Sequence, residues 1–256
     1  MKIDSSSPVT RSSRGRGRLI RATLTVLTVL AVTAADAGAE TVKGTVAGTV
    51  RVDGECPKLP PVKVAKDASV CGAEQASEAA SAGAEGSLRN VVVSLHAVKP
   101  PAPAAPPPPG KATVDQVGCM YRPHVQAVTV GSELTLVNSD RVLHNVHANL
   151  AGVTVFNMAM PIKGQRLPTK LTRPGPVRLQ CDAGHTWMNA WIYVLSEPLF
   201  AVTDDRGHFS IPAVPAGEYT IEYWHEPLDG KGAGITKSAR LVVGDKPVRA
   251  DANLKL

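Results

Sequence analysis

Apolar and polar residues alternate over short stretches along most of this 256-residue chain, and no stretch keeps an apolar stripe at the 3.6-residue period of a helix. Alternation with a period of two predicts strands that bury one face. The pattern predicts strands over residues 43–52, 90–95, 126–130, 133–138, 177–181, 191–195, 208–211, 219–225 and 239–243. Together they predict an all-β protein built from packed sheets.

Three stretches between the strands carry their own signals. Gly131-Ser132 separates two of the predicted strands and predicts a tight hairpin between them. Residues 73–86 are rich in Ala, Ser and Gly without an apolar stripe, which indicates a loop. Residues 99–111 are so rich in proline that we expect an extended, semi-rigid connector, because proline cannot join a central strand.

The first 39 residues have the pattern of an export signal. An apolar run over residues 22–35 leads to the small residues Ala37, Gly38 and Ala39, which suit a signal peptidase. The run follows a basic region containing Arg11, Arg14, Arg16, Arg18 and Arg21. We therefore expect a signal peptide at 1–39, a periplasmic or otherwise exported protein, and no membrane span after cleavage. An uncleaved N-terminal anchor is the alternative.

Removing the signal changes the charge of the chain. The full sequence has 28 Lys and Arg against 22 Asp and Glu, a net charge of +6. Lys2 and the five arginines leave with the signal, as do Asp4 and Asp36, so 22 basic and 20 acidic residues remain and the net charge is +2. The mature part has no clustered basic face, which argues against nucleic acid as a partner.

Two later segments bring together the residue types of a copper site. One contains His144 in the run His-Asn-Val-His, and the other reads Cys181-Asp-Ala-Gly-His185-Thr-Trp-Met188. One thiolate and two imidazoles with a weak thioether are the donors of blue-copper centres, and they suit both Cu(I) and Cu(II). Zinc is the less fitting alternative because Met is a poor zinc ligand.

These segments, within residues 118–196, resemble the cupredoxins, and most closely the plastocyanin and amicyanin group. The resemblance implies a Greek-key sandwich that binds one mononuclear Cu(I)/Cu(II) ion. It implies four metal ligands, namely His144, Cys181, His185 and Met188. Asn145 would tie the His144 segment to the Cys181 loop, and His147 matches a histidine that is not a ligand in that family.

One departure from the family concerns spacing. Amicyanin and plastocyanin separate the Cys and the second His by two residues, whereas three residues separate Cys181 from His185. The copper-A motif has that spacing, but its other cysteine would fall at Val177. A dinuclear centre is therefore not expected.

The cysteines leave several pairings open. An exported chain can form disulfides, and if Cys181 is a ligand, three cysteines remain. The sequence does not choose among the pairs 56–71, 71–119 and 56–119. Cys119 and His124 are candidates for a second metal site, with a disulfide half and a turn histidine as the simpler interpretation. A disulfide between Cys119 and Cys181 is the alternative to a copper site.

The resemblance implies a one-electron carrier between periplasmic redox partners, such as a cytochrome or a copper or haem enzyme. It further implies that the ring edge of His185 faces solvent as the gateway, with Met160 and Trp187 nearby. We expect a monomer and no enzyme, because no Ser-His-Asp order, paired carboxylates or phosphate loop is present. The alternatives are copper storage, delivery or sensing without electron transfer, and a structural binding module whose copper site is vestigial.

A second resemblance concerns the flanking segments. Residues 204–211 read D-x-x-G-x-F-x-I and residues 215–221 read P-x-G-x-Y-x-I, which resembles the carboxypeptidase regulatory-like β-sandwich. Residues 44–54 resemble that family's opening strand. We therefore expect a cupredoxin-like domain at 113–197 that is inserted in, or followed by, a second small sandwich. In the inserted case an N-terminal β segment at 40–112, including the connector, pairs with residues 198–256.

Overall fold

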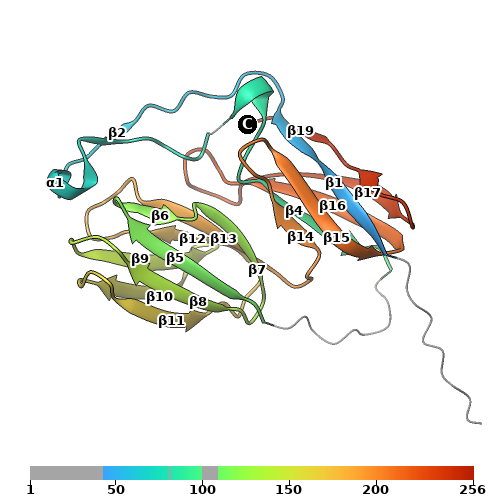
Figure 1. The fold of residues 1–256 in the computed structure, drawn as a ribbon. Helices are drawn as coiled ribbons and strands as arrows, with labels where there is room; N and C mark the ends of the chain where they lie inside the picture. Colours follow the sequence, from blue (N-terminus) through green and yellow to red (C-terminus); the bar gives the residue numbers. More distant parts are fainter. Residues whose placement is uncertain (1–42, 81, 100–108) are drawn as a thin grey trace, which may run out of the picture. The chain divides into compact units, whose positions relative to one another are not determined.

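The structure is a computed structural model that describes residues 43–80, 82–99 and 109–256 (Figure 1). The predicted signal at 1–39 and most of the proline-rich connector lie outside these residues. Strands dominate the described part, which confirms the prediction of an all-β protein. No helix in the three described ranges is long and apolar enough to cross a membrane.

The elements follow one another along the chain as short strands with two brief helical turns. The helical turns are α1 (Ala68–Cys71) and a 3-10 turn at Ala84–Gly86. The strands are β1 (Lys43–Val52), β2 (Val62–Lys63), β3 (Glu74–Gln75), β4 (Val92–Ala97), β5 (Lys111–Val117), β6 (Met120–Arg122), β7 (Val125–Thr129), β8 (Glu133–Asn138), β9 (His144–Leu150), β10 (Val153–Met160), β11 (Arg166–Lys170), β12 (Gly175–Gln180), β13 (Asn189–Leu195), β14 (Phe200–Val202), β15 (His208–Pro215), β16 (Gly217–His225), β17 (Ile235–Val243), β18 (Val248–Arg249) and β19 (Ala252–Leu254).

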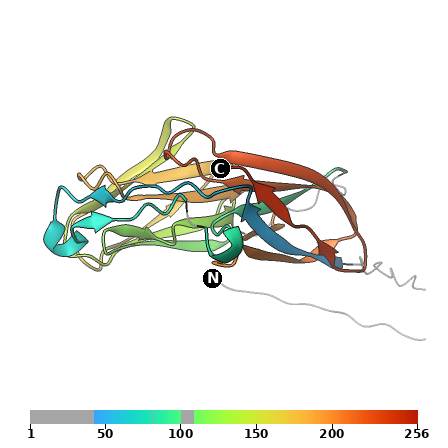
Figure 2. The same ribbon diagram turned by 90° about the horizontal axis from the view of Figure 1, so that it is seen from above.

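One pair of sheets, here called the outer sandwich, combines strands from both ends of the described chain. Its first sheet has the order β15-β1-β18, with β19 also pairing with β1, and its second has the order β14-β4-β16-β17. In Figure 2 the blue strand β1 lies beside the red strands of the C-terminal end. The register sets Gly48 opposite Phe209 and Leu95 opposite Ile221. Alternate apolar side chains of both sheets then meet in one buried cluster that includes Val46, Phe209 and Tyr223.

The other pair of sheets, here called the inner sandwich, contains only strands from Lys111 to Leu195. Its sheets have the orders β10-β9-β12-β13-β7 and β11-β8-β5-β6. Their inward side chains form a second core that includes Leu136, Val146 and Ile192. Strand β5 begins at Lys111, inside the range predicted as connector, because its backbone pairs in parallel with β8.

The hairpin predicted at Gly131-Ser132 is wrong. Strand β7 pairs with β13 and strand β8 with β5 and β11, so the two strands lie in different sheets. The turn instead carries the chain from one layer to the other. Gly131 has a φ of 86°, and its N–H donates to the carbonyl of Leu171 at 2.6 Å. Both flanking strands bury apolar residues in the same core from opposite sides. Periodicity alone cannot distinguish two strands in facing sheets from two strands that pair as a hairpin.

The pairing of β9, β12 and β13 positions the candidate site. Gln180, the last residue of β12, lies opposite His147 of β9 and opposite Asn189, the first residue of β13. The loop between β12 and β13 therefore leaves the sheet at the edge where β9 begins. His144 is the first residue of β9, so it meets the Cys181–Met188 loop although the two segments are far apart in sequence.

A third buried cluster contains side chains from both sandwiches. Trp224 of β16 contacts Trp191 of β13 in a T-shaped arrangement, with ring centroids 5.6 Å apart. Val92, Val125 and Leu195 complete the buried cluster. Two large aromatic side chains, one from each sandwich, thus pack against each other where strands β13 and β16 meet.

Candidate metal centre

Three side-chain donors converge at the edge described above. The Nδ1 atoms of His144 and His185 are 3.0 Å apart, and the Sγ atom of Cys181 is 3.6 Å from Nδ1 of His185. Their ligand atoms form a group within 4.8 Å of one another, and all three residues are buried. Cys181 carries a free thiol rather than a disulfide. Two imidazoles and a thiol therefore face one point inside the inner sandwich.

Two carboxylates set the orientation of the two imidazoles. Nε2 of His144 contacts Oδ2 of Asp140 at 2.9 Å, and Nε2 of His185 contacts Oδ2 of Asp67 at 2.9 Å. A carboxylate accepts but does not donate, so each Nε2 carries the proton and each Nδ1 keeps its lone pair. Both lone pairs then point to the convergence point, which is the tautomer that metal binding requires.

Asp140 is itself held in place by the backbone. Its two carboxylate oxygens accept the N–H groups of Gly118 and Cys119, each at 2.8 Å. Burial lowers the pKa of His144 from its ordinary value, and the neighbouring His185 lowers it further, while Asp140 opposes both effects. The imidazole of His144 is thus favoured in its neutral form, which is the form that binds metals.

The donor distances fit one first-row metal ion. Two nitrogens at about 2.0 Å from an ion, at an angle of about 100°, lie about 3.1 Å apart. A thiolate sulfur at about 2.3 Å lies about 3.7 Å from such a nitrogen at an angle of about 120°. The observed separations of 3.0 and 3.6 Å are close to both values. A soft thiolate with two imidazoles in a buried setting suits copper better than a hard cation such as Mg²⁺ or Ca²⁺.

Met188 lies in the same loop, three residues after His185. Its backbone N–H donates to the carbonyl of His185 at 2.9 Å, and its side chain is 1% exposed. It belongs to the same buried cluster as Cys181. The turn thus keeps the thioether inside the sandwich on the loop that also supplies the thiol and one imidazole.

The expectation that a ring edge of His185 faces solvent is wrong. His185 is 0% exposed because Asp67 covers Nε2 and the ring of Trp187 lies against it at a centroid distance of 5.3 Å. Met160 and Trp187, expected near the gateway, are also buried. The indole N–H of Trp187 donates to the carbonyl of Cys119 at 3.0 Å, so this ring closes the site rather than presenting it.

Asn145 makes the link that the resemblance implied. Its Oδ1 accepts the backbone N–H of Asp182, which follows Cys181 directly, and its Nδ2 donates to Oδ1 of Asn157. The hydroxyl of Tyr121 donates to the carbonyl of Asn145. Burial raises the pKa of Tyr121 well above its ordinary value, so the phenol stays protonated and keeps this hydrogen bond. Side-chain hydrogen bonds therefore join the start of β9 to the loop that follows Cys181 and to β6.

The remaining candidate ligands have other partners. Cys119 forms a disulfide with Cys71, so it offers no thiolate, and the alternative disulfide to Cys181 is excluded. His124 contacts Glu226 through Nε2, and His147 contacts Asp182 and Thr154 through its two ring nitrogens. Neither histidine belongs to a converging group of donors in the described residues. The sequence left these interpretations open because side-chain partners so far apart in the chain have no local pattern.

Two functional residues were missed by the sequence analysis. Asp140 lies four residues before His144, and that spacing was a usable signal for a carboxylate that orients a ligand. Asp67 lies 118 residues from His185 in a stretch of low periodicity, and no local pattern indicates their contact. The disulfide and the fold of residues 62–75 help to bring this carboxylate to the imidazole.

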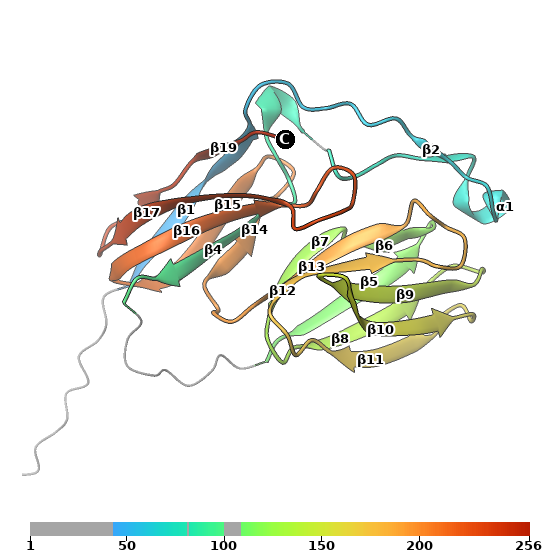
Figure 3. The ribbon, with the colours of Figure 1, turned by 180° about the vertical axis from the view of Figure 1, so that it is seen from behind.

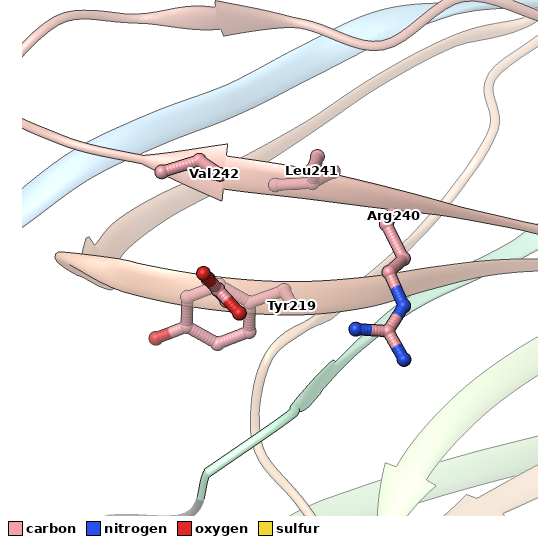
Figure 4. Close-up of a pocket in the computed structure, with 5 residues that line it drawn as sticks. Tyr219, Arg240, Leu241 and Val242 are labelled. Carbon is pink, nitrogen blue, oxygen red and sulfur yellow. The ribbon is translucent and has the colours of Figure 1, made fainter.

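A separate pocket lies on the outer sandwich and contains none of these donors. Figure 4 shows its lining on β16 and β17, with the side chains of Tyr219 and Arg240 next to the paired strands. Glu218, Leu241 and Val242 complete the lining. None of its lining residues belongs to a group of converging metal donors among the residues that the structure describes.

No family model and no curated protein matches this chain. Parts of several solved structures resemble it. A purple cupredoxin from Nitrosopumilus maritimus is 22% identical over 33% of this chain and 99% of its own, with a TM-score of 0.29. A Cu-containing nitrite reductase from Thermus scotoductus SA-01 is 27% identical over 41% of this chain and 26% of its own, with a TM-score of 0.29. A mutant of amicyanin in its oxidized state is 26% identical over 34% of this chain and 83% of its own, with a TM-score of 0.30.

Proposed function

We propose that this chain is an exported, mononuclear copper protein of the cupredoxin type that carries single electrons. One observation carries the proposal: the thiol of Cys181 and the Nδ1 atoms of His144 and His185 converge inside the inner sandwich at separations that one metal ion would bridge. Both rings have their other nitrogen hydrogen-bonded, so the three donors are ready without rearrangement.

In this proposal four residues hold the ion. Cys181 supplies the thiolate, His144 and His185 supply neutral imidazoles, and Met188 supplies a weak thioether from the same loop. Copper bound by such donors supplies a reversible one-electron couple, because sulfur suits Cu(I) and imidazole suits Cu(II). The role of the protein is to keep these donors fixed and dry, so that little rearranges between the two oxidation states.

The burial of the donors favours an electron carrier over the other function classes. His144 and His185 are fully buried, and Cys181 is 6% exposed. An enzyme needs an open position at which substrate can reach the reacting group, and these side chains leave no exposed edge. A delivery protein needs an edge at which a partner can take the ion. Electron transfer needs neither, since an electron crosses a thin protein layer without contact between the metal and its partner.

The proposal extends to location and partners. The signal pattern at residues 1–39 supports export, and the disulfide between Cys71 and Cys119 fits an oxidising compartment. The partner would be a second redox protein, such as a cytochrome or a copper or haem enzyme, with the chain acting as a monomer. The carboxypeptidase regulatory-like interpretation of the outer sandwich remains a prediction, and it suits a presenting or binding role rather than a catalytic one.

The deciding experiment is an optical spectrum of the purified chain after addition of one equivalent of Cu(II). We expect an intense visible band from the thiolate of Cys181 that bleaches with ascorbate and returns on reoxidation. The band should be absent in Cys181→Ser and in His144→Ala. His147→Ala is the matched control, because this histidine lies on the same strand but outside the converging group, and it should keep the band.

Each other outcome assigns the chain differently. Copper bound without the thiolate band, and lost rapidly to a chelator, would identify storage or delivery. No bound copper would leave a structural sandwich with a vestigial site. For Met188, the measurement is the colour and reduction potential of Met188→Ala, and no change in either would remove this residue from the ligand set.

A further inference from the structure

The connection between β1 and β4 contains a small element that belongs to neither sandwich. It is here called the strap and comprises residues 62–75, with β2 and β3 paired to each other and α1 between them (Figure 3). Strands of two residues and a helix of one turn cannot be stable by themselves. The contacts of the strap with the inner sandwich must therefore hold it in place.

Those contacts reach both segments that surround the converging donors. On one side, Cys71 at the end of α1 is bonded to Cys119, and Nε2 of Gln75 donates to the carbonyl of Gly118 at 3.3 Å. On the other side, Nζ of Lys66 donates to the carbonyl of Ala183 at 2.7 Å. Ala183 lies in the loop between Cys181 and His185. The strap is thus fixed to the chain before the first imidazole and to the loop that carries the second.

The carboxylate of Asp67 has an unusual position within the strap. Asp67 is the residue before the first turn of α1, where an Asp side chain ordinarily accepts a backbone N–H of the helix. Here it makes no such bond, and Oδ2 instead contacts Nε2 of His185 at 2.9 Å. The backbone of Asp67 is left-handed, with a φ of 56°, a conformation that residues other than glycine adopt uncommonly and that Asp and Asn tolerate better than most. Both the omitted cap and the backbone conformation are explained if the contact with His185 is what the segment preserves.

We propose that Asp67 is a positioning residue of the metal centre, which acts through His185 and is held there by the disulfide of the strap. This inference rests on the proposed function. The carboxylate fixes the imidazole with Nδ1 inward and makes it a stronger donor to the oxidised ion. It also covers the ring edge, so that neither a chelator nor a redox partner reaches the centre through His185.

The proposal predicts slow release of copper and a reduction potential that depends on Asp67. Removing a hydrogen-bonded partner of a ligand histidine typically weakens metal binding by about 10- to 100-fold. We expect Asp67→Ala to release Cu(II) to excess EDTA about 10- to 100-fold faster than the wild type. Its potential should be higher, because the oxidised ion loses more stabilisation than the reduced one. Asp67→Asn keeps an acceptor without the charge and should lie between the two.

The test combines metal-free and copper-loaded measurements on the full chain. In the metal-free protein, nitrogen NMR of the histidine rings should show His185 with its proton on Nε2, and Asp67→Ala should lose this fixed tautomer. With Cu(II) as the only added ligand, release to EDTA and the potential are then measured. Glu74→Gln is the matched control, since it removes one negative charge from an exposed strand residue of the same strap. Cys71→Ser combined with Cys119→Ser should act in the same direction as Asp67→Ala, because it removes the tether.

The outcomes separate this inference from the proposed function. If Asp67→Ala keeps the tautomer and releases copper within twofold of Glu74→Gln, Asp67 has no positioning role. If the wild type takes up no Cu(II), the proposed copper function fails, and the tautomer of His185 in the metal-free protein alone decides whether Asp67 positions this ring.

Discussion

Asp140 offers the sharpest test of how the site is built, because its carboxylate accepts hydrogen bonds both from backbone N–H groups and from the candidate ligand His144. It accepts from the N–H of Gly118, the N–H of Cys119 and Nε2 of His144, at 2.8, 2.8 and 2.9 Å. Replacement of Asp140 by Asn conserves the shape of the side chain. It removes the negative charge and turns one of the two acceptor oxygens into a donor.

The cost of Asp140→Asn follows from these three contacts. The amide oxygen can face Cys119 and His144 together, since both bond to Oδ2, which leaves the NH₂ group facing the N–H of Gly118. Gly118 is exposed, so water can replace this bond at small cost. The other two bonds change from charge-assisted to neutral, and each loses about 1 kcal/mol. The total is about 2–3 kcal/mol of unfolding free energy.

The assay is urea unfolding of the metal-free protein, followed by near-ultraviolet circular dichroism at neutral pH. Asp115→Asn is the matched control, since it removes the same charge from the adjacent strand β5. Asp115 accepts only from Oγ of Ser139 at 2.8 Å, and its other oxygen has no hydrogen-bond partner in the described structure. We expect Asp140→Asn to be less stable than this control by at least 1 kcal/mol, with an unchanged dependence on urea.

The reasoning would be refuted if the two variants unfolded at the same urea concentration. That result would mean that the three donors around Asp140 find equivalent partners elsewhere, and that His144 does not depend on this carboxylate. A lower stability combined with an altered dependence on urea would instead indicate a changed unfolded or native ensemble, and it would not measure the hydrogen bonds.

Two further predictions concern the D-x-x-G turn before β15. Gly207 has a φ of 72°, and an added Cβ would lie 2.4 Å from the carbonyl oxygen of Val50, so Gly207→Ala should lower the unfolding free energy by about 2–4 kcal/mol. The control is Gly232→Ala, at a glycine with a φ of 86° and no atom within 4 Å of the added Cβ. It should lower the unfolding free energy by about 1 kcal/mol in the same urea titration. Hydrogen bonds from the backbone N–H of His208 and, to a lesser degree, of Arg206 lower the pKa of Asp204 below its unfolded value of about 3.9. The ionised carboxylate therefore stabilises the folded protein above about pH 3.9, and this stabilisation is lost as the pH falls through the folded pKa. Asp204→Asn should therefore be less stable than the wild type by at most about 1 kcal/mol at pH 7. The difference in melting temperature between the two proteins should become smaller toward pH 3. Equal melting temperatures at pH 7 would contradict the role given to this carboxylate.

Periodicity predicted most of the strands that bury one face, and it missed those whose side chains are polar. Residues 43–52 and 133–138 match β1 and β8 along their whole lengths. Strands β9 and β10 were not predicted, because His144, Asn145 and Asn149 interrupt the apolar pattern and β10 is a largely exposed edge. His144 and Asn145 are there for the candidate site, so local pattern fails where chemistry replaces packing.

The donor set was predicted from residue types, whereas the surroundings of the donors were not. Cys181 and His185 share one loop, and their close spacing is visible in the sequence. The carboxylate of Asp67 and the partner of Cys119 depend on how the strap folds back, and many chain paths are compatible with the same sequence pattern. This is also why the exposed gateway was predicted wrongly, since the carboxylate that covers Nε2 of His185 comes from a segment outside the resemblance.

The sheet order of the outer sandwich has a consequence for the order in which the chain folds. Gly48 of β1 pairs with Phe209, 161 residues later, and β4 pairs with β14 and β16 from the same late segment. At synthesis rates of about 5–20 residues per second, β1 waits roughly 8–30 seconds for its partner. The inner sandwich finds all its strand partners between Lys111 and Leu195, so it closes first.

During that time β4 is the strand of the chain most prone to aggregation. Its residues Val92, Val93 and Leu95 become fully buried only when the C-terminal strands arrive. Until then an apolar, β-branched strand has both edges open to pairing with other copies. A chain that stops soon after β13 would leave β4 unpaired, so the strands after residue 195 protect this early strand from aggregation.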